Sequence, residues 1–338
     1  MRLGLVLGGG GLVGMGYHAG ALKALDEWGL DVGAADLMVG TSAGSIMASY
    51  MAAADWTPDD FYNYAHGKHP DVQKDPADPK EQLRQVFTPL SHSAGERVRR
   101  SVGSMFALAS SRGYVKKLGG GLPAQGLRKA FPAGIYSTEE TRRRFQEDLP
   151  AEWPDRKLYI CAVDLYSGER IAFGHPAAPE APLPEAVLAS TSIPGIFPPV
   201  RIDGHQYVDG GVASATSLDL ATDNGCELIL CIAPLGYRND GLLSARDPKM
   251  WSAMFVRSLF ARSLRREVVS ARERGSHVLV VRPWVSNLKL HGTNSMRAFD
   301  RAALTDNARE GTLRLLQENE DHPVLAGWKR KSTRKKAG

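Results

Sequence analysis

The first 55 residues constrain the fold most strongly, because they alternate apolar strand-like runs with helical segments. Gly4–Leu7 and Asp36–Val39 are short apolar runs of the kind found in buried parallel strands. Each run is followed by glycines and then by a helix-forming segment, Tyr17–Glu27 and Ser45–Ala54 respectively. This strand-helix-strand-helix order predicts an α/β fold. We expect a three-layer α/β/α sandwich around a mostly parallel central sheet.

The remaining regular segments continue this alternation with a looser middle part. Further strands are expected at Lys157–Val163, Ile171–Gly174, Gln206–Val208, Leu228–Ala233 and Val278–Arg282. Further helices are expected at Gly95–Leu108, Thr138–Leu149, Ser217–Asn224, Met250–Arg274 and Ser295–Gln317. The run Ser192–Val200 contains three prolines, which remove backbone donors, so we expect a rigid loop there.

Domain organisation and charge give three further expectations. We expect one catalytic domain over residues 1–325, with residues 57–150 as a helical insertion or lid, and a basic, disordered tail over residues 326–338. Six cationic side chains lie in the last ten residues: Lys329, Arg330, Lys331, Arg334, Lys335 and Lys336. Such a tail can attract an anionic membrane surface, and no specific nucleic-acid partner is predicted. With no leader pattern before the first strand, we expect a cytoplasmic protein, with peripheral membrane contact as a second possibility.

The five residues Gly40-Thr41-Ser42-Ala43-Gly44 match the Gly-x-Ser-x-Gly nucleophile elbow. In this motif a sharp turn from strand to helix presents the serine hydroxyl to a cleft, and glycines are needed where a Cβ would collide. The apolar strand before the motif and the Ala-rich helix after it give the context that the motif requires. Ser42 is therefore the candidate nucleophile.

The glycine loop Gly8–Gly14 has three competing explanations. Gly9-x-Gly11-x-x-Gly14 after a strand matches a dinucleotide-binding fingerprint, but that fold also needs an acidic residue at the end of the second strand, where this chain has Gly40-Thr41-Ser42. Bare backbone amides can instead form an oxyanion hole for a tetrahedral acyl intermediate. A plain structural loop is the third explanation.

A serine nucleophile needs a base, and none of the nine histidines lies in an obvious turn after a strand with a carboxylate partner. Asp209-Gly210-Gly211 follows a short strand and has the steric freedom to face a cleft. Asp-Gly is also a strong hairpin signal, so the sequence pattern alone leaves both explanations open.

Together, the glycine loop, the Gly-x-Ser-x-Gly elbow, the Ser-Ile-Pro-Gly-Ile-Phe-Pro-Pro loop and Asp-Gly-Gly resemble the bacterial patatin-like phospholipases. The resemblance covers Leu3–Ala54 and Lys157–Ala233. It implies that Ser42 attacks the acyl carbonyl, that Asp209 is its base without a histidine, and that Gly9, Gly10 and Gly11 form the oxyanion hole. The family loop usually carries Arg or Lys where this chain has Val13.

The sequence therefore predicts a hydrolase of lipid acyl esters that uses a Ser42–Asp209 dyad and needs no metal or cofactor. The alternatives are a catalytically weak lipid-binding or scaffolding protein, an acyltransferase that uses the same serine, and a dinucleotide enzyme. The three cysteines, Cys161, Cys226 and Cys231, are expected to be buried reduced thiols. The head group of the lipid and the oligomeric state are not set by the sequence.

Overall fold

The computed structural model describes residues 1–74, 79–91, 93–100, 134–238, 248–291, 296 and 300–337. The chain divides into two compact units. The first comprises Met1–Lys74, Pro154–Tyr159 and Ser214–Gly338, and the second comprises Asp75–Trp153 and Ile160–Ala213. The prediction of a single domain over residues 1–325, with a lid over residues 57–150, stays a prediction. Residues 101–133 of that segment lie outside the described part.

The sheet of the first unit is parallel and buried. Its strands β1 (Leu3–Leu7), β2 (Leu37–Thr41), β7 (Leu228–Ile232) and β8 (His277–Val281) lie in the order β2-β1-β7-β8. All residues of β1, β2 and β7 are buried, as expected for continuous apolar runs in a sheet that is covered on both faces. The carboxyl ends of β1 and β2 are in register, with Leu7 opposite Gly40. The glycine loop and Ser42 therefore leave the sheet side by side.

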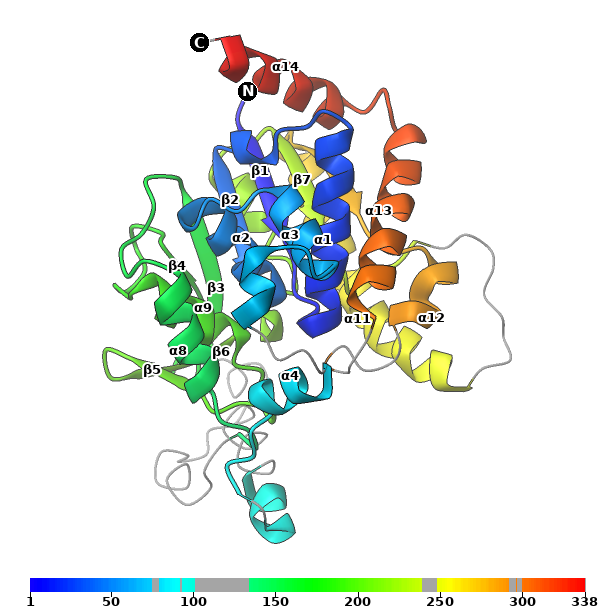
Figure 1. The fold of residues 1–338 in the computed structure, drawn as a ribbon. Helices are drawn as coiled ribbons and strands as arrows, with labels where there is room; N and C mark the ends of the chain where they lie inside the picture. Colours follow the sequence, from blue (N-terminus) through cyan, green and yellow to red (C-terminus); the bar gives the residue numbers. More distant parts are fainter. Residues whose placement is uncertain are drawn as a thin grey trace. The chain divides into compact units, whose positions relative to one another are not determined.

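Helices connect and cover these strands (Figure 1). They are α1 (Gly11–Glu27), α2 (Ala43–Ala53), α3 (Pro58–Ala65), α10 (Asp219–Asp223), α11 (Pro248–Glu273), α12 (Leu288–His291), α13 (Arg301–Gln317) and α14 (Pro323–Ala337). Short 3-10 helices lie at Val32–Ala34, Pro70–Lys74 and Val285–Asn287.

The second unit is built on antiparallel strands. β3 (Leu158–Asp164) starts in the first unit and continues into the second, where it pairs with β4 (Arg170–Phe173) and β6 (His205–Asp209). β6 also pairs with β5 (Val200–Ile202). The helices of this unit are α4 (Pro79–Val86), α8 (Glu139–Asp148) and α9 (Leu183–Thr191), and a 3-10 helix spans Gly210–Val212. With these strands the central sheet is mixed but mostly parallel, and the predicted α/β class is confirmed.

The largest difference from the expected elements is the basic tail. We predicted disorder for residues 326–338, whereas α14 is helical from Pro323 to Ala337. The reason is an apolar start to the helix: Val324, Leu325 and Trp328 are buried, and the Trp328 indole N–H donates to the Asp31 carbonyl at 2.7 Å. Burial of the first turns overrides the low apolar content of the remaining tail.

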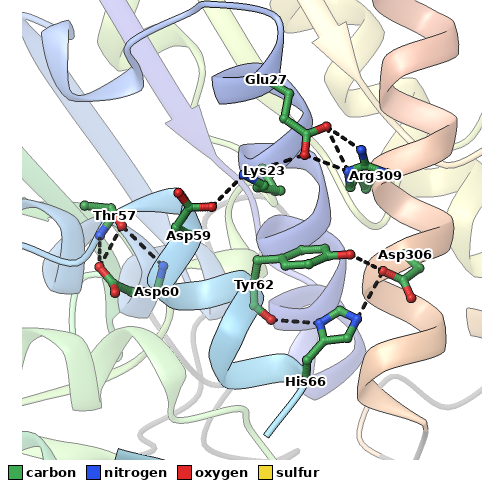
Figure 2. A network of polar contacts seen from close by, with 9 residues as sticks. All are labelled: Lys23, Glu27, Thr57, Asp59, Asp60, Tyr62, His66, Asp306 and Arg309. Carbon is green, nitrogen blue, oxygen red and sulfur yellow. Dashed lines mark hydrogen bonds and ion pairs between the residues drawn. The ribbon is translucent and has the colours of Figure 1, made fainter. Parts of the chain in front are cut away.

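Polar contacts tie α3 and α13 to α1 (Figure 2). The Arg309 guanidinium of α13 holds the Glu27 carboxylate of α1 at 2.6–3.0 Å. The Tyr62 hydroxyl of α3 donates to Asp306 of α13 at 2.5 Å, and His66 Nε2 lies 3.1 Å from the same carboxylate oxygen. These helices are thereby fixed to one another in the first unit.

α1 and α13 approach so closely that only glycine fits at one contact (Figure 1). A Cβ at Gly20 would lie 2.0 Å from the Thr305 carbonyl oxygen and 2.8 Å from the Arg309 amide nitrogen, both backbone atoms of α13. Gly14, on the same helix, has only ordinary van der Waals space around its Cβ position, with a nearest atom at 3.5 Å.

The buried His18 of α1 supports the end of β1. Its Nε2 lies 2.7 Å from the Gly8 carbonyl oxygen, and a carbonyl can only accept, so Nε2 carries the proton. Nδ1 is buried without a hydrogen-bond partner among the described residues. Burial lowers the pKa of His18 to about 4, against a smaller opposing effect of the bond to Gly8. His18 is therefore neutral at physiological pH.

We predict that Gly20→Ala destabilises the protein by about 3 kcal/mol, because the added methyl group forces the two helix backbones apart. Gly14→Ala should be neutral or stabilising by up to about 1 kcal/mol, since alanine favours helix more than glycine does. Urea unfolding of both variants measures the difference. Equal stability of the two variants would contradict the close packing of α1 on α13.

We also predict a pH dependence of stability that His18 causes. Its folded-state pKa lies below the unfolded value of about 6.5, so the unfolded chain binds the proton more readily below that pH. The contribution of neutral His18 to the free energy of unfolding is fully present above about pH 6.5. It is lost as the pH falls through about 4. At pH 5 the loss amounts to about 2 kcal/mol. Urea unfolding at pH 7.5 and pH 5 should show a smaller loss for His18→Gln; the same loss in both proteins would contradict this assignment.

Candidate active site

Ser42 occupies the sharp turn between β2 and α2. Its backbone angles are φ 54° and ψ −123°, and it is one of four non-glycine residues with positive φ among those described. Such a conformation costs about 1–3 kcal/mol in a residue with a side chain and persists only where surrounding contacts hold it. Two bonds do so here: the Ser45 amide and hydroxyl both donate to the Ser42 carbonyl, at 2.8 and 2.6 Å.

The two glycines that flank the turn are required by sterics. A Cβ at Gly40 would lie 2.6 Å from the Ser45 Cα, and a Cβ at Gly44 would lie 1.9 Å from the Leu7 carbonyl oxygen. Both clashes involve backbone atoms, which cannot rotate away. The second contact also shows how closely the start of α2 lies against the end of β1.

The glycine loop lies directly beside Ser42. A Cβ at Gly9 would be 3.3 Å from the Ser42 Cβ. The loop is held by its first two amides, because Gly8 donates to the Ile232 carbonyl at 2.9 Å and Gly9 donates to the Ala215 carbonyl at 2.7 Å. The amide of Gly9 is therefore occupied.

The amides of Gly10 and Gly11 remain available. In the described part of the chain, neither donates to a protein acceptor. Gly11 begins α1 and has φ 60°, a conformation that favours glycine. The positive end of the helix dipole lies here, so an anion next to these amides is favoured. Of the three glycines expected to form an oxyanion hole, Gly9, Gly10 and Gly11, only Gly10 and Gly11 therefore have free amides.

Asp209 belongs to the second unit, where it ends β6 and is 5% exposed. Its Oδ1 accepts from the Gly211 amide at 2.7 Å, and its own amide donates to the Ser192 carbonyl at 3.0 Å. A Cβ at Gly210 would lie 2.4 Å from the Cys161 carbonyl oxygen, so that position needs glycine. The hairpin explanation of Asp-Gly is wrong at this position, because Asp209 caps a 3-10 helix.

The hairpin signal was correct for a different pair, Asp203-Gly204. Both residues have positive φ, 46° and 76°, and they join β5 to β6. Among the described residues, one Asp-Gly pair therefore turns a hairpin and another ends a strand, and the sequence pattern does not distinguish them.

Several supporting residues were missed by sequence reasoning. Ser192 holds the Asp209 amide with its carbonyl, and its hydroxyl donates to the Leu188 carbonyl at 2.8 Å. The neighbouring Ser190 hydroxyl donates to the Cys161 carbonyl at 2.6 Å. The sequence signal for these residues was a pair of serines at the end of an apolar helical run. We did not predict that helix, α9. Buried serines at that place have to satisfy their hydroxyls within the protein.

The basic tail and the candidate nucleophile lie at opposite ends of the first unit's sheet. α14 packs beside residues at the amino ends of the strands: Gly327 faces Leu228 and Met1, and Lys331 pairs with Asp36. Ser42 follows the carboxyl end of β2. Figure 1 shows α14 next to the N-terminus. Membrane contact through the tail therefore stays a prediction, and it would involve the end of the sheet away from Ser42.

Within the described ranges, no cluster of three or more His, Cys, Asp or Glu residues could hold a metal ion. None of the helices described there is both long and apolar enough to cross a bilayer. The three cysteines are free and buried, as predicted.

Comparison with known proteins finds one matching family and two similar structures. The model of the patatin-like phospholipases matches residues 5–222, a range that includes Ser42, the glycine loop and Asp209. VipD from Legionella pneumophila is similar in structure, with 18% identity and a TM-score of 0.45 over 94% of this chain and 67% of VipD. The type III effector protein ExoU has 15% identity and a TM-score of 0.37 over 94% of this chain and 53% of ExoU.

The family match covers more than half of the 338 residues and agrees with the motifs described above. The chain therefore belongs to the patatin-like phospholipase family, a family of lipid hydrolases.

Proposed function

We propose that this protein hydrolyses carboxylic acyl esters of lipids, with Ser42 as the nucleophile. The observation that carries the proposal is the strained turn at Ser42, held between two obligatory glycines beside a loop with two free backbone amides. Strained backbone of this kind is characteristic of functional positions. Family membership supports the lipid as substrate class.

The oxyanion hole is proposed to consist of the Gly10 and Gly11 amides. As the Ser42 Oγ attacks the acyl carbonyl, negative charge develops on the carbonyl oxygen. Preorganised amides that face this oxygen stabilise the transition state by about 3 kcal/mol for each donor. The helix dipole of α1 adds to the same effect.

We propose Asp209 as the general base. It accepts the Ser42 hydroxyl proton during attack, and the proton then passes to the departing alcohol as the acyl-enzyme forms. In the second half of the reaction Asp209 accepts a proton from water, which attacks the acyl-enzyme; the proton returns to Ser42 as the fatty acid leaves. Two histidines of the first unit have other partners, since His18 binds the Gly8 carbonyl and His66 lies against Asp306.

The first test is fatty-acid release from phosphatidylcholine, lysophosphatidylcholine and a p-nitrophenyl ester. Ser42→Ala should lower the rate at least about a thousandfold, because the nucleophile is lost. Ser49→Ala is the matched control on the same helix, since the Ser49 hydroxyl is buried without a hydrogen-bond partner among the described residues and should leave the rate unchanged. Full activity in Ser42→Ala would remove Ser42 from the mechanism.

If lipid binds equally to wild type and Ser42→Ala but neither releases fatty acid, the lipid-binding or scaffolding alternative is favoured. Addition of an alcohol acceptor tests the acyltransferase alternative. Transfer to the alcohol at the expense of free fatty acid would assign transferase activity to the same serine.

The second prediction concerns Asp209. Asp209→Asn keeps the size of the side chain but removes its basicity, so turnover should fall at least about a hundredfold. Asp203→Asn, in the β5–β6 hairpin, is the control, because asparagine tolerates positive φ and the turn is retained. The same assay measures both variants. Equal activity of Asp209→Asn and Asp203→Asn would exclude Asp209 as the base.

A further inference from the structure

The segment 214–218, which we call the Ser214 loop, is held by one carboxylate of α11. Glu267 accepts three hydrogen bonds from it: from the Ser214 hydroxyl at 2.5 Å, the Thr216 hydroxyl at 2.8 Å and the Leu218 amide at 3.0 Å. The Ser214 hydroxyl in turn accepts from the Ser217 amide at 2.9 Å. One carboxylate therefore binds the first, third and fifth residues of this loop.

The Ser214 loop in turn holds the glycine loop. Its second residue, Ala215, supplies the carbonyl that accepts the Gly9 amide at 2.7 Å. A Cβ at Gly8 would lie 3.0 Å from this same oxygen and 3.1 Å from the Thr216 side chain. The position of Gly9, and with it the direction of the next two amides, thus depends on the Ser214 loop.

A second charged side chain of α11, Arg257, reaches the glycine loop through Pro234. The Arg257 guanidinium donates to the Pro234 carbonyl at 2.7 Å and to the Gly236 carbonyl at 3.1 Å. Pro234 lies against the glycine loop, since a Cβ at Gly10 would be 2.9 Å from the Pro234 Cβ. Arg257 is 7% exposed, and no carboxylate of the described residues lies within ion-pairing distance of it.

A small cavity lies between the glycine loop and α11, lined by Gly9, Ala215, Gly236, Phe260 and Leu264 among others. Arg257 is a charged group that is withdrawn from water, which is costly unless its donors are satisfied. Its guanidinium donates to the Pro234 and Gly236 carbonyls, so its bonds go to the segment that lies against the glycine loop.

We propose that Glu267 and Arg257 are positioning residues that hold the glycine loop with the Gly10 and Gly11 amides directed at the oxyanion. Glu267 acts through the Ser214 loop on Gly9, and Arg257 acts through Pro234 on Gly10. This inference rests on the proposed function for its catalytic consequence. The structural part, that α11 restrains the glycine loop, is measurable without any activity.

The test combines hydrogen exchange of the peptide that contains the glycine loop with the rate at which a fluorophosphonate probe modifies Ser42. Glu267→Met should make the Gly9 amide exchange faster, because its acceptor Ala215 is no longer held. It should also slow modification by roughly tenfold to a hundredfold, as expected for a displacement of about 1 Å. Glu273→Met, an exposed position of the same helix, is the control and should change neither quantity.

Two further variants keep the proposal testable if Glu267→Met fails to fold. Thr216→Val removes one of the three bonds to Glu267 and should give a smaller change of the same kind. Glu267→Gln keeps the size of the side chain and one of its two acceptor oxygens, which can still bind Thr216 and Leu218, so it should slow modification less than Glu267→Met does. Arg257→Met should likewise speed exchange of the glycine loop and slow modification of Ser42, whereas the exposed Arg262→Met should change neither.

Unchanged exchange and unchanged modification rates in folded Glu267→Met and Arg257→Met would overturn the proposal. So would faster exchange with an unchanged modification rate, because the loop position would then not affect the reaction. A variant that is merely less stable would be modified by the probe at the wild-type rate per folded molecule. That result would also contradict a positioning role. If the probe fails to modify wild-type Ser42, the proposed function fails, while exchange still decides whether α11 restrains the loop.

Discussion

The backbone contact between Gly44 and Leu7 is the constraint on which the rest of the site depends. A side chain at Gly44 would overlap the Leu7 carbonyl oxygen at 1.9 Å, so α2 can begin this close to the end of β1 only with glycine there. The turn that results forces Ser42 into positive φ and places it beside Gly9. A larger residue at position 44 would separate the nucleophile from the loop that is proposed to stabilise its reaction.

The same close approach explains why the glycine loop needs support from outside itself. Four consecutive glycines have no side chains with which to pack, and glycine loses more conformational freedom on folding than any other residue. Three different elements supply the missing interactions: Ile232 of β7 binds Gly8, Ala215 binds Gly9, and His18 binds the Gly8 carbonyl. These neighbours satisfy the first polar groups of the loop, whereas the amides of Gly10 and Gly11 have no acceptor among the described residues.

Local sequence signals predicted every strand of the sheet except the short β5, which begins at the end of the Pro-rich run that we expected to be a loop. Gly4–Leu7 and Leu228–Ala233 were recognised because fully buried parallel strands are continuously apolar. Gly40 and Gly44 were recognised because their steric requirement is local. The tail was predicted wrongly, because the burial of Trp328 against Asp31 depends on a contact almost 300 residues away in sequence.

Other features of the site could not be predicted for a similar reason. The Gly9 amide is not free because it binds the Ala215 carbonyl, a residue far away in the sequence. The proposed roles of Glu267 and Arg257 depend on which loops α11 faces. In the sequence α11 is simply a helix with many arginines. A crystal structure of the protein after reaction with a fluorophosphonate tests the proposed site most directly. We expect phosphorus bonded to Ser42 Oγ, its oxygen about 3 Å from the Gly10 and Gly11 nitrogens, and the Asp209 carboxylate facing Oγ. Modification of another residue, or an oxygen directed away from the glycine loop, would contradict it.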